Sequence, residues 1–162
     1  MRTLVLLSFL ALLWSCDNSQ RFNFNNKNID AVRYAYCDAS IPPKLQRNYT
    51  ITVTPDRVEM VVSGGDTIPR DTSVVCSQQA FNKIIDLLNS EKIRNGELSN
   101  NDGCTGGDSE SLSCFANNSL VFSGDVYYCG GKKSGNLKGD IGRVSEAICN
   151  LIPNFESVLR SK

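Results

Sequence analysis

The chain offers seven cysteines and no histidine for reactive chemistry. Without an imidazole, the catalytic triads that use histidine as general base are excluded, and so is every Cys/His zinc site. No two cysteines have the C-x-x-C spacing that four-cysteine zinc sites use. The thiols are therefore expected in disulfides, and the odd count leaves one cysteine that needs another role.

That cysteine is Cys16, which closely follows an apolar run from Leu4 to Trp14. With Arg2 ahead of it, the run has the length of a signal-peptide core and is too short to span a bilayer as a helix. Its end, Leu13-Trp14-Ser15-Cys16, resembles the bacterial lipoprotein signal at Leu13, Ser15 and Cys16. The resemblance implies that residues 1–15 are a signal peptide and that Cys16 becomes acylated. The mature protein is then expected to be anchored in a lipid bilayer, on the cell membrane or outer membrane, facing the periplasm or the exterior.

The remainder divides into a tether and one domain. Residues 16–30 are polar, with no aliphatic side chain before Ile29, and indicate a flexible tether; residues 31–162 are expected to form a single domain. Removing residues 1–15 takes Arg2 from the 17 basic residues and leaves 16 against 17 acidic ones. A balance so close to neutral predicts no nucleic-acid partner.

The six cysteines beyond the anchor can close three disulfides, as an oxidising compartment favours. Positions along the chain suggest one pairing among fifteen: Cys37–Cys76, Cys104–Cys129 and Cys114–Cys149. The last bond requires the covered face of a sheet to carry Cys114, because the cysteines must lie with Cα atoms about 5.5 Å apart.

Carboxylates are the other candidates for chemistry. Asp102, Asp108 and Glu110 lie in a stretch of Asn, Gly and Ser, where a solvated loop is the simpler interpretation. The same stretch lacks the spacing of a calcium loop. Lys132 and Lys133 stand among glycines and serines, where a tight turn is favoured over an anion site. We therefore expect no catalytic residue, metal or cofactor.

Periodicity supplies the elements that position these groups. Alternating apolar residues predict a strand over 31–36 and a hairpin over 49–62 that turns at Pro55-Asp56. A helical stripe predicts a helix that begins at Ser77 and stops at Asn95-Gly96. A second hairpin around Asn117-Asn118, with Gly124 at a close approach, and a helix from Asp140 to Pro153 complete the domain.

The resulting order of strand, hairpin, helix, hairpin and helix predicts an α+β fold. We expect a twisted antiparallel sheet of about five strands, with two helices on one face and disulfides that stabilise it.

Together these features favour an exported, membrane-anchored lipoprotein that acts as a non-catalytic binding or inhibitor-like module of the cell envelope. Its partner is expected to be a protein or a glycan. Ser123-Gly124-Asp125-Val126-Tyr127 is similar to the S-G-x-x-Y loop of lipoprotein lysozyme inhibitors, although a strand is the preferred interpretation here. The alternative is a hydrolase of envelope polymers that uses its carboxylates.

Overall fold

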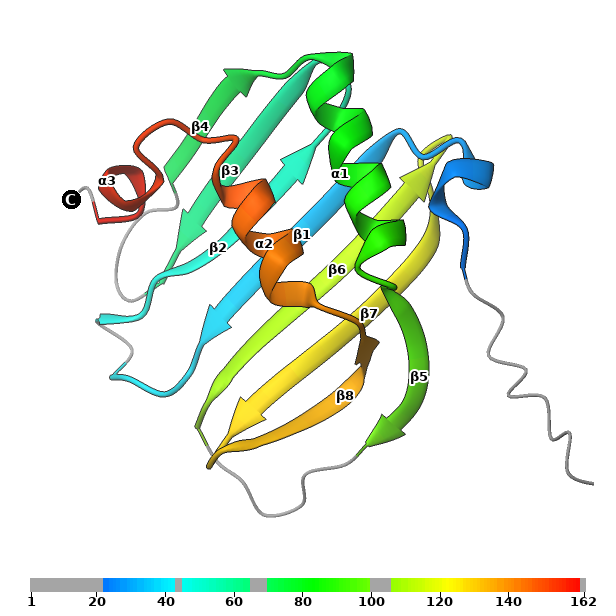
Figure 1. Cartoon of the computed structure of the whole chain (residues 1–162). Helices are drawn as coiled ribbons and strands as arrows, with labels where there is room; N and C mark the ends of the chain where they lie inside the picture. The colour runs from blue at the N-terminus through cyan, green and yellow to red at the C-terminus, as the bar shows by residue number, and fades with distance from the viewer. Residues whose placement is uncertain (1–21, 43–44, 65–69, 100–105, 161–162) are drawn as a thin grey trace, which may run out of the picture.

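The computed structural model describes residues 22–42, 45–64, 70–99 and 106–160. Eight strands form one sheet in the order β4-β3-β2-β1-β6-β7-β8-β5, and every neighbouring pair is antiparallel (Figure 1). The strands are β1 (Ala31–Asp38), β2 (Asn48–Val53), β3 (Arg57–Ser63), β4 (Arg70–Val75), β5 (Arg94–Ser99), β6 (Asp108–Ala116), β7 (Ser119–Cys129) and β8 (Lys132–Lys138). The helices are the 3-10 helix η2 (Phe24–Lys27), α1 (Gln78–Ser90), α2 (Ile141–Cys149) and α3 (Phe155–Arg160).

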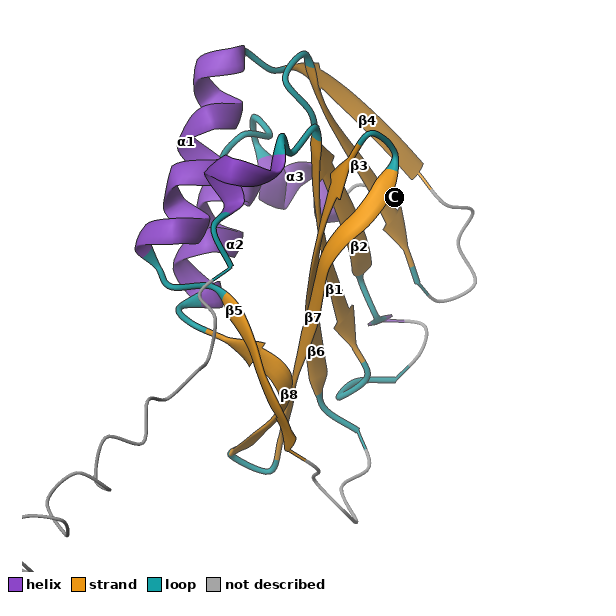
Figure 2. Ribbon diagram, turned by 90° about the vertical axis from the view of Figure 1, so that its right-hand side faces the viewer, coloured by secondary structure: helices purple, strands orange, loops and turns teal. Residues whose placement is uncertain are grey.

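The helices lie on one side of the sheet, and the other side is uncovered by the described elements (Figure 2). Alternation along the strands turns apolar residues toward the helices: β3, for example, buries Val58, Met60 and Val62 and exposes the residues between them. The core therefore lies between the sheet and its helical layer.

The expected fold was wrong in its strand count, since the sheet has eight strands and the described chain has three α-helices. The missed strands are β4, β5 and β8, two of which form the edges of the sheet. Their sequences are rich in charged, polar and glycine residues, which is typical of edges that must not pair with other molecules. Such strands lack the apolar alternation from which the others were predicted.

Both predicted hairpins are present. The first pairs Val53 with Val58, and the Thr54 hydroxyl donates to Asp56 Oδ1 at 2.7 Å within its turn. The second turns at Asn117 and Asn118, both in the left-handed region with φ of 51° and 59°, as a two-residue hairpin loop requires. Gly124 is a close-approach point, because a Cβ there would lie 2.9 Å from Leu137 Cδ1.

Both predicted helices are also present, but their ends were misplaced. Ser77 caps α1, which buries its predicted stripe of Phe81, Ile84, Ile85 and Leu88 and ends at Ser90. The expected stop, Asn95-Gly96, belongs to β5 instead. Asp140 caps α2, and that helix ends at Cys149, ahead of Pro153.

The amino-terminal part of the described chain packs on the domain instead of forming a tether up to Ala31. Asn23 caps η2 through its side chain, and Phe24 is only 1% exposed within the core. The fold therefore includes residues from Phe22 onward.

Two of the proposed disulfides are absent, because Cys37, Cys76, Cys114 and Cys149 carry free thiols. Cys37 points from the uncovered face near one end of β1. Cys76 follows edge strand β4 and hydrogen-bonds through its N–H to Asp56, near the opposite end of the sheet. Strands β1 and β4 are separated by β2 and β3, or about 14 Å, so the pair lies far beyond disulfide reach.

Cys114 does face the helical layer, as its proposed bond required, and is fully buried. Cys114 pairs with Val32. The Cys149 sulfur instead lies near the hydroxyl of Tyr49, a residue that is level with Glu110 across the sheet because both pair with Tyr36. The two positions are four residue steps apart along β6, about 13 Å. Burial raises the pKa of the Cys114 thiol to about 12, so this thiol is unreactive at neutral pH. The third pair stays a prediction: Cys104 lies outside the described residues, and Cys129 is not among the free thiols.

Candidate functional site

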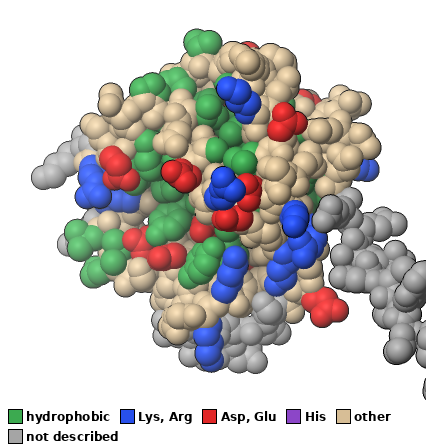
Figure 3. All heavy atoms as spheres, viewed as in Figure 1, with side chains coloured by type: hydrophobic (Ala, Val, Ile, Leu, Met, Phe, Trp, Pro, Cys, Tyr) green, Lys and Arg blue, Asp and Glu red, His purple; other side chains and the backbone are tan. Residues whose placement is uncertain are grey.

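Tyrosines and carboxylates gather on the helix-facing side of the sheet at one end of β1 and β6. The register forms two rows across the strands: Tyr49, Tyr36 and Glu110, then Asp38, Asp108 and Tyr128. With Tyr34 these residues form what we call the tyrosine–carboxylate cluster. Because residues two apart on a strand share a face, the strands themselves align these side chains. On the left of this face, Figure 3 shows acidic side chains among hydrophobic ones. Tyrosines are coloured with the hydrophobic side chains in that view.

Glu110 is the centre of the cluster. The Tyr34 hydroxyl donates to Glu110 Oε2 at 2.9 Å, and Tyr34 itself is only 2% exposed. The rings of Tyr36 and Tyr49 stack with centroids 5.4 Å apart, and Phe155 of α3 meets Tyr49 edge-on at 5.2 Å. These contacts fix rings from β1, β2 and α3 around the Glu110 carboxylate of β6.

Asp108 lies in the second row, beside a shallow hollow. The Ser40 hydroxyl lies 2.7 Å from Asp38 Oδ1 and 3.1 Å from Asp108 Oδ1, which joins the two carboxylates. The hollow has a volume of about 370 Å³ and is lined by Ser40, Asp108, Tyr128, Cys129 and four glycines. Small residues around it leave the acidic row open to a ligand.

The carboxylates of the cluster have no basic ion-pair partner among the residues that the structure describes. Within the described parts of the chain, no Lys or Arg forms an ion pair with Asp38, Asp108 or Glu110. Lys133, the cross-strand partner of Tyr128, places its Nζ 5.5 Å from the Tyr128 ring centroid. The cluster therefore combines negative charge with aromatic faces that attract cations.

The surroundings keep the tyrosines protonated. Burial, then the charges of Asp108 and Asp38, raises the pKa of Tyr36 to about 12. Burial, then Glu110, raises the pKa of Tyr128 to about 12. The pKa values of Tyr34 and Tyr49 are also raised, in both cases mainly by burial. The hydroxyls therefore serve as hydrogen-bond donors at any physiological pH.

These shifts predict alkaline instability. Above the unfolded tyrosine pKa of about 10, the unfolded chain loses protons that the folded protein keeps, so stability should fall between pH 10 and 12. Tyrosinate absorbance at 295 nm in the folded protein should show the four cluster tyrosines still protonated at pH 11. In Glu110→Gln, Tyr128 should ionise at lower pH than in the unaltered protein. Full ionisation of the folded protein by pH 10.5 would contradict the cluster as described.

The structure brings together Asp108 and Glu110 among the sequence candidates. Asp102 and Cys16 lie outside the described residues. Lys132 and Lys133 belong to β8, where Lys133 is the cross-strand partner of Tyr128 and so lies beside the cluster. Ser123 and Tyr127 lie within β7, so this part of the chain is a strand and not the loop of the lysozyme inhibitors.

Sequence reasoning missed the role of the tyrosines. The alternation over 31–36 and 49–53 places Tyr34 and Tyr36 on one face of their strand and Tyr49 on one face of the next, but it assigns no role to their hydroxyls. The signal in the sequence was three tyrosines at inward positions of two adjacent strands. Each buried hydroxyl needs a hydrogen-bond partner, which indicates polar side chains nearby.

No family model matches the chain, and no curated protein or solved structure is significantly similar to it. Among the described residues, no helix is long and apolar enough to cross a membrane. The same residues contain no group of three or more metal-binding side chains.

Proposed function

We propose that this protein is an exported, lipid-anchored module of the cell envelope that binds a partner without catalysing a reaction. The sequence around Cys16 supports the anchor, and the tyrosine–carboxylate cluster supports the binding role. The observation that carries the proposal is the accumulation of three carboxylates that no described basic residue neutralises, beside four tyrosines.

The chemistry of the cluster favours a ligand that presents a basic group. An ammonium or guanidinium group would find carboxylate acceptors at Asp108 and Glu110 and aromatic faces beside them. Lys133 over the Tyr128 ring is an internal example of such a contact. We infer that the partner is an envelope protein or glycan that offers a Lys, an Arg or an amino sugar to this site.

A hexalysine peptide tests the binding role, with neutral tri-N-acetylchitotriose as the comparison ligand. Glu110→Gln keeps the shape of the side chain and removes its charge, so affinity for hexalysine should fall about tenfold or more in titration calorimetry. Asp71→Asn is the matched control, because Asp71 is exposed on the uncovered face. Equal loss in both variants, or preference for the neutral sugar, would contradict a cationic ligand.

The alternative is a carboxylate-dependent hydrolase of envelope polymers. It is favoured by one observation: Asp108 and Glu110 are two residues apart on β6 and face the same side, with Cα atoms about 7 Å apart. Glycosidases place two carboxyl groups about 5–9.5 Å apart. The test is incubation with purified peptidoglycan. Release of soluble sugars by the wild-type protein but not by Glu110→Gln would show hydrolysis and overturn the proposal of a non-catalytic binding role.

A further inference from the structure

The described chain begins at a fixed point on the domain surface. Phe22 packs against Phe24 and Phe122, with ring centroids 4.7 and 5.2 Å away, and Phe24 N–H donates to Asn89 Oδ1 of α1 at 3.1 Å. The chain that leads back to Cys16 therefore leaves the domain beside the carboxyl-terminal end of α1.

Basic side chains surround this point. Lys27 Nζ lies 5.7 Å from the Phe22 ring centroid. Lys92 and Arg94 line a groove of about 270 Å³ together with Phe22, Asn23, Asn25, Asn89 and Ile93. Lys138 is the cross-strand partner of Arg94. We call these four residues, Lys27, Lys92, Arg94 and Lys138, the exit patch.

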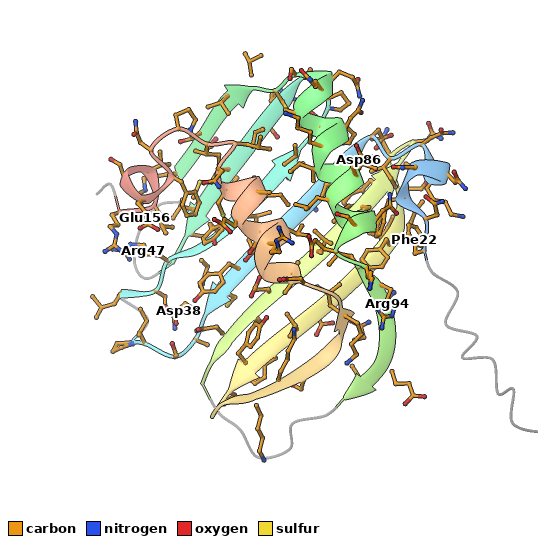
Figure 4. The ribbon with its side chains drawn as sticks, viewed as in Figure 1. Phe22, Asp38, Arg47, Asp86, Arg94 and Glu156 are labelled. Atoms are coloured by element: carbon orange, nitrogen blue, oxygen red, sulfur yellow. The ribbon has the colours of Figure 1, made fainter. Side chains whose placement is uncertain are left out.

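The acidic residues nearby leave the patch positive. Glu91 forms an ion pair with Arg143 at 2.9 Å, and the Asp140 carboxylate caps α2 by accepting from the Arg143 N–H. Asp86 lies more than a turn back along α1, and Glu97 follows on β5. Figure 4 places Phe22 next to Arg94, with Asp86 farther along α1. Basic side chains gather over the same part of the molecule in Figure 3.

We propose that the exit patch docks on anionic lipid headgroups of the membrane that holds Cys16. The inference rests on the proposed lipid anchor for its geometry. Five residues separate Cys16 from Phe22, so the two Cα atoms can be at most about 20 Å apart. A tether this short keeps the exit patch near the headgroups, whose negative potential attracts basic side chains within a Debye length.

Docking through the exit patch orients the candidate site. Phe115 of β6 pairs with Ala31, the first residue of β1 and the one nearest the exit point along the chain. Asp108 lies at the other end of β6. Phe115 and Asp108 are seven residue steps apart along the strand, about 23 Å. Figure 4 shows Asp38 and Phe22 at opposite sides of the molecule. The tyrosine–carboxylate cluster therefore faces away from the bilayer, toward a partner in the surrounding space.

The test uses the expected mature chain, residues 16–162, as Cys16→Ser, so that neither lipid nor the apolar run Leu4–Trp14 contributes and any membrane binding comes from the domain surface. Sedimentation with vesicles of phosphatidylcholine containing 30% phosphatidylglycerol should show binding that weakens as salt rises, and pure phosphatidylcholine should show little. Removing two basic groups in Lys92→Asn/Arg94→Ser should weaken binding about 25-fold, or roughly fivefold for each group.

Arg33→Ser/Arg57→Ser provides the matched control, because both arginines are exposed on the uncovered face of the sheet and the charge change is equal. The inference is overturned if this control loses as much affinity as the exit-patch variant, or if salt and phosphatidylglycerol have no effect. Circular dichroism confirms that each variant is folded. Failure of the lipid anchor has a separate readout: Cys16 of the wild-type protein would carry no lipid, and this result does not depend on the vesicle measurements.

Discussion

Replacing Phe24 with alanine should lower the free energy of unfolding by about 3–5 kcal/mol. The side chain is 1% exposed and packs among core residues from β7 and α1, with its ring 5.1 Å from that of Phe122. Its removal leaves a cavity in a part of the chain that composition alone assigns to a tether.

Urea unfolding followed by circular dichroism measures this loss, and Asn25→Ala, an exposed change in the same turn, is the control. The midpoint should shift strongly for Phe24→Ala and little for Asn25→Ala. A loss below about 1 kcal/mol for Phe24→Ala would mean that residues 22–27 are not part of the cooperative core.

The substitution Cys16→Ser should move the protein from the membrane fraction to the soluble fraction, or leave it unprocessed with residues 1–15 attached. Serine has no thiol to accept the diacylglyceryl group, and the anchor depends on that bond. Cys37→Ser is the control, since Cys37 is an exposed free thiol whose loss should not alter fractionation. If the Cys16→Ser protein fractionates and migrates like the unaltered one, the anchor is wrong.

The elements that could be predicted are those whose residues satisfy two local rules at once. The β2–β3 hairpin combines alternating apolar residues with Pro55-Asp56 at the turn, and α1 combines an apolar stripe with a Ser77 cap. The second hairpin has Asn117-Asn118 in the left-handed conformation that its turn requires. In each case local sequence and tertiary packing favour the same structure.

The features that were missed depend on contacts between distant parts of the chain. Phe24 is isolated among asparagines, and only its docking onto α1 and Phe122 makes it a core residue. Two of the proposed cysteine pairs, Cys37–Cys76 and Cys114–Cys149, failed for the same reason, because their positions in sequence did not reveal where strand order would place them. The tyrosine–carboxylate cluster likewise exists only because the register aligns Tyr36 with Glu110 and Asp38 with Asp108.

The mass of the amino-terminal tryptic peptide, Cys16–Arg21, tests the central claim of a lipid-anchored module most directly. The protein is extracted from membranes with detergent, digested and analysed by mass spectrometry. A lipid-anchored protein yields a peptide that begins at Cys16 and carries a diacylglyceryl group on its sulfur. A peptide that continues upstream of Cys16, or a Cys16 thiol that reacts fully with an alkylating reagent, would contradict the lipid anchor.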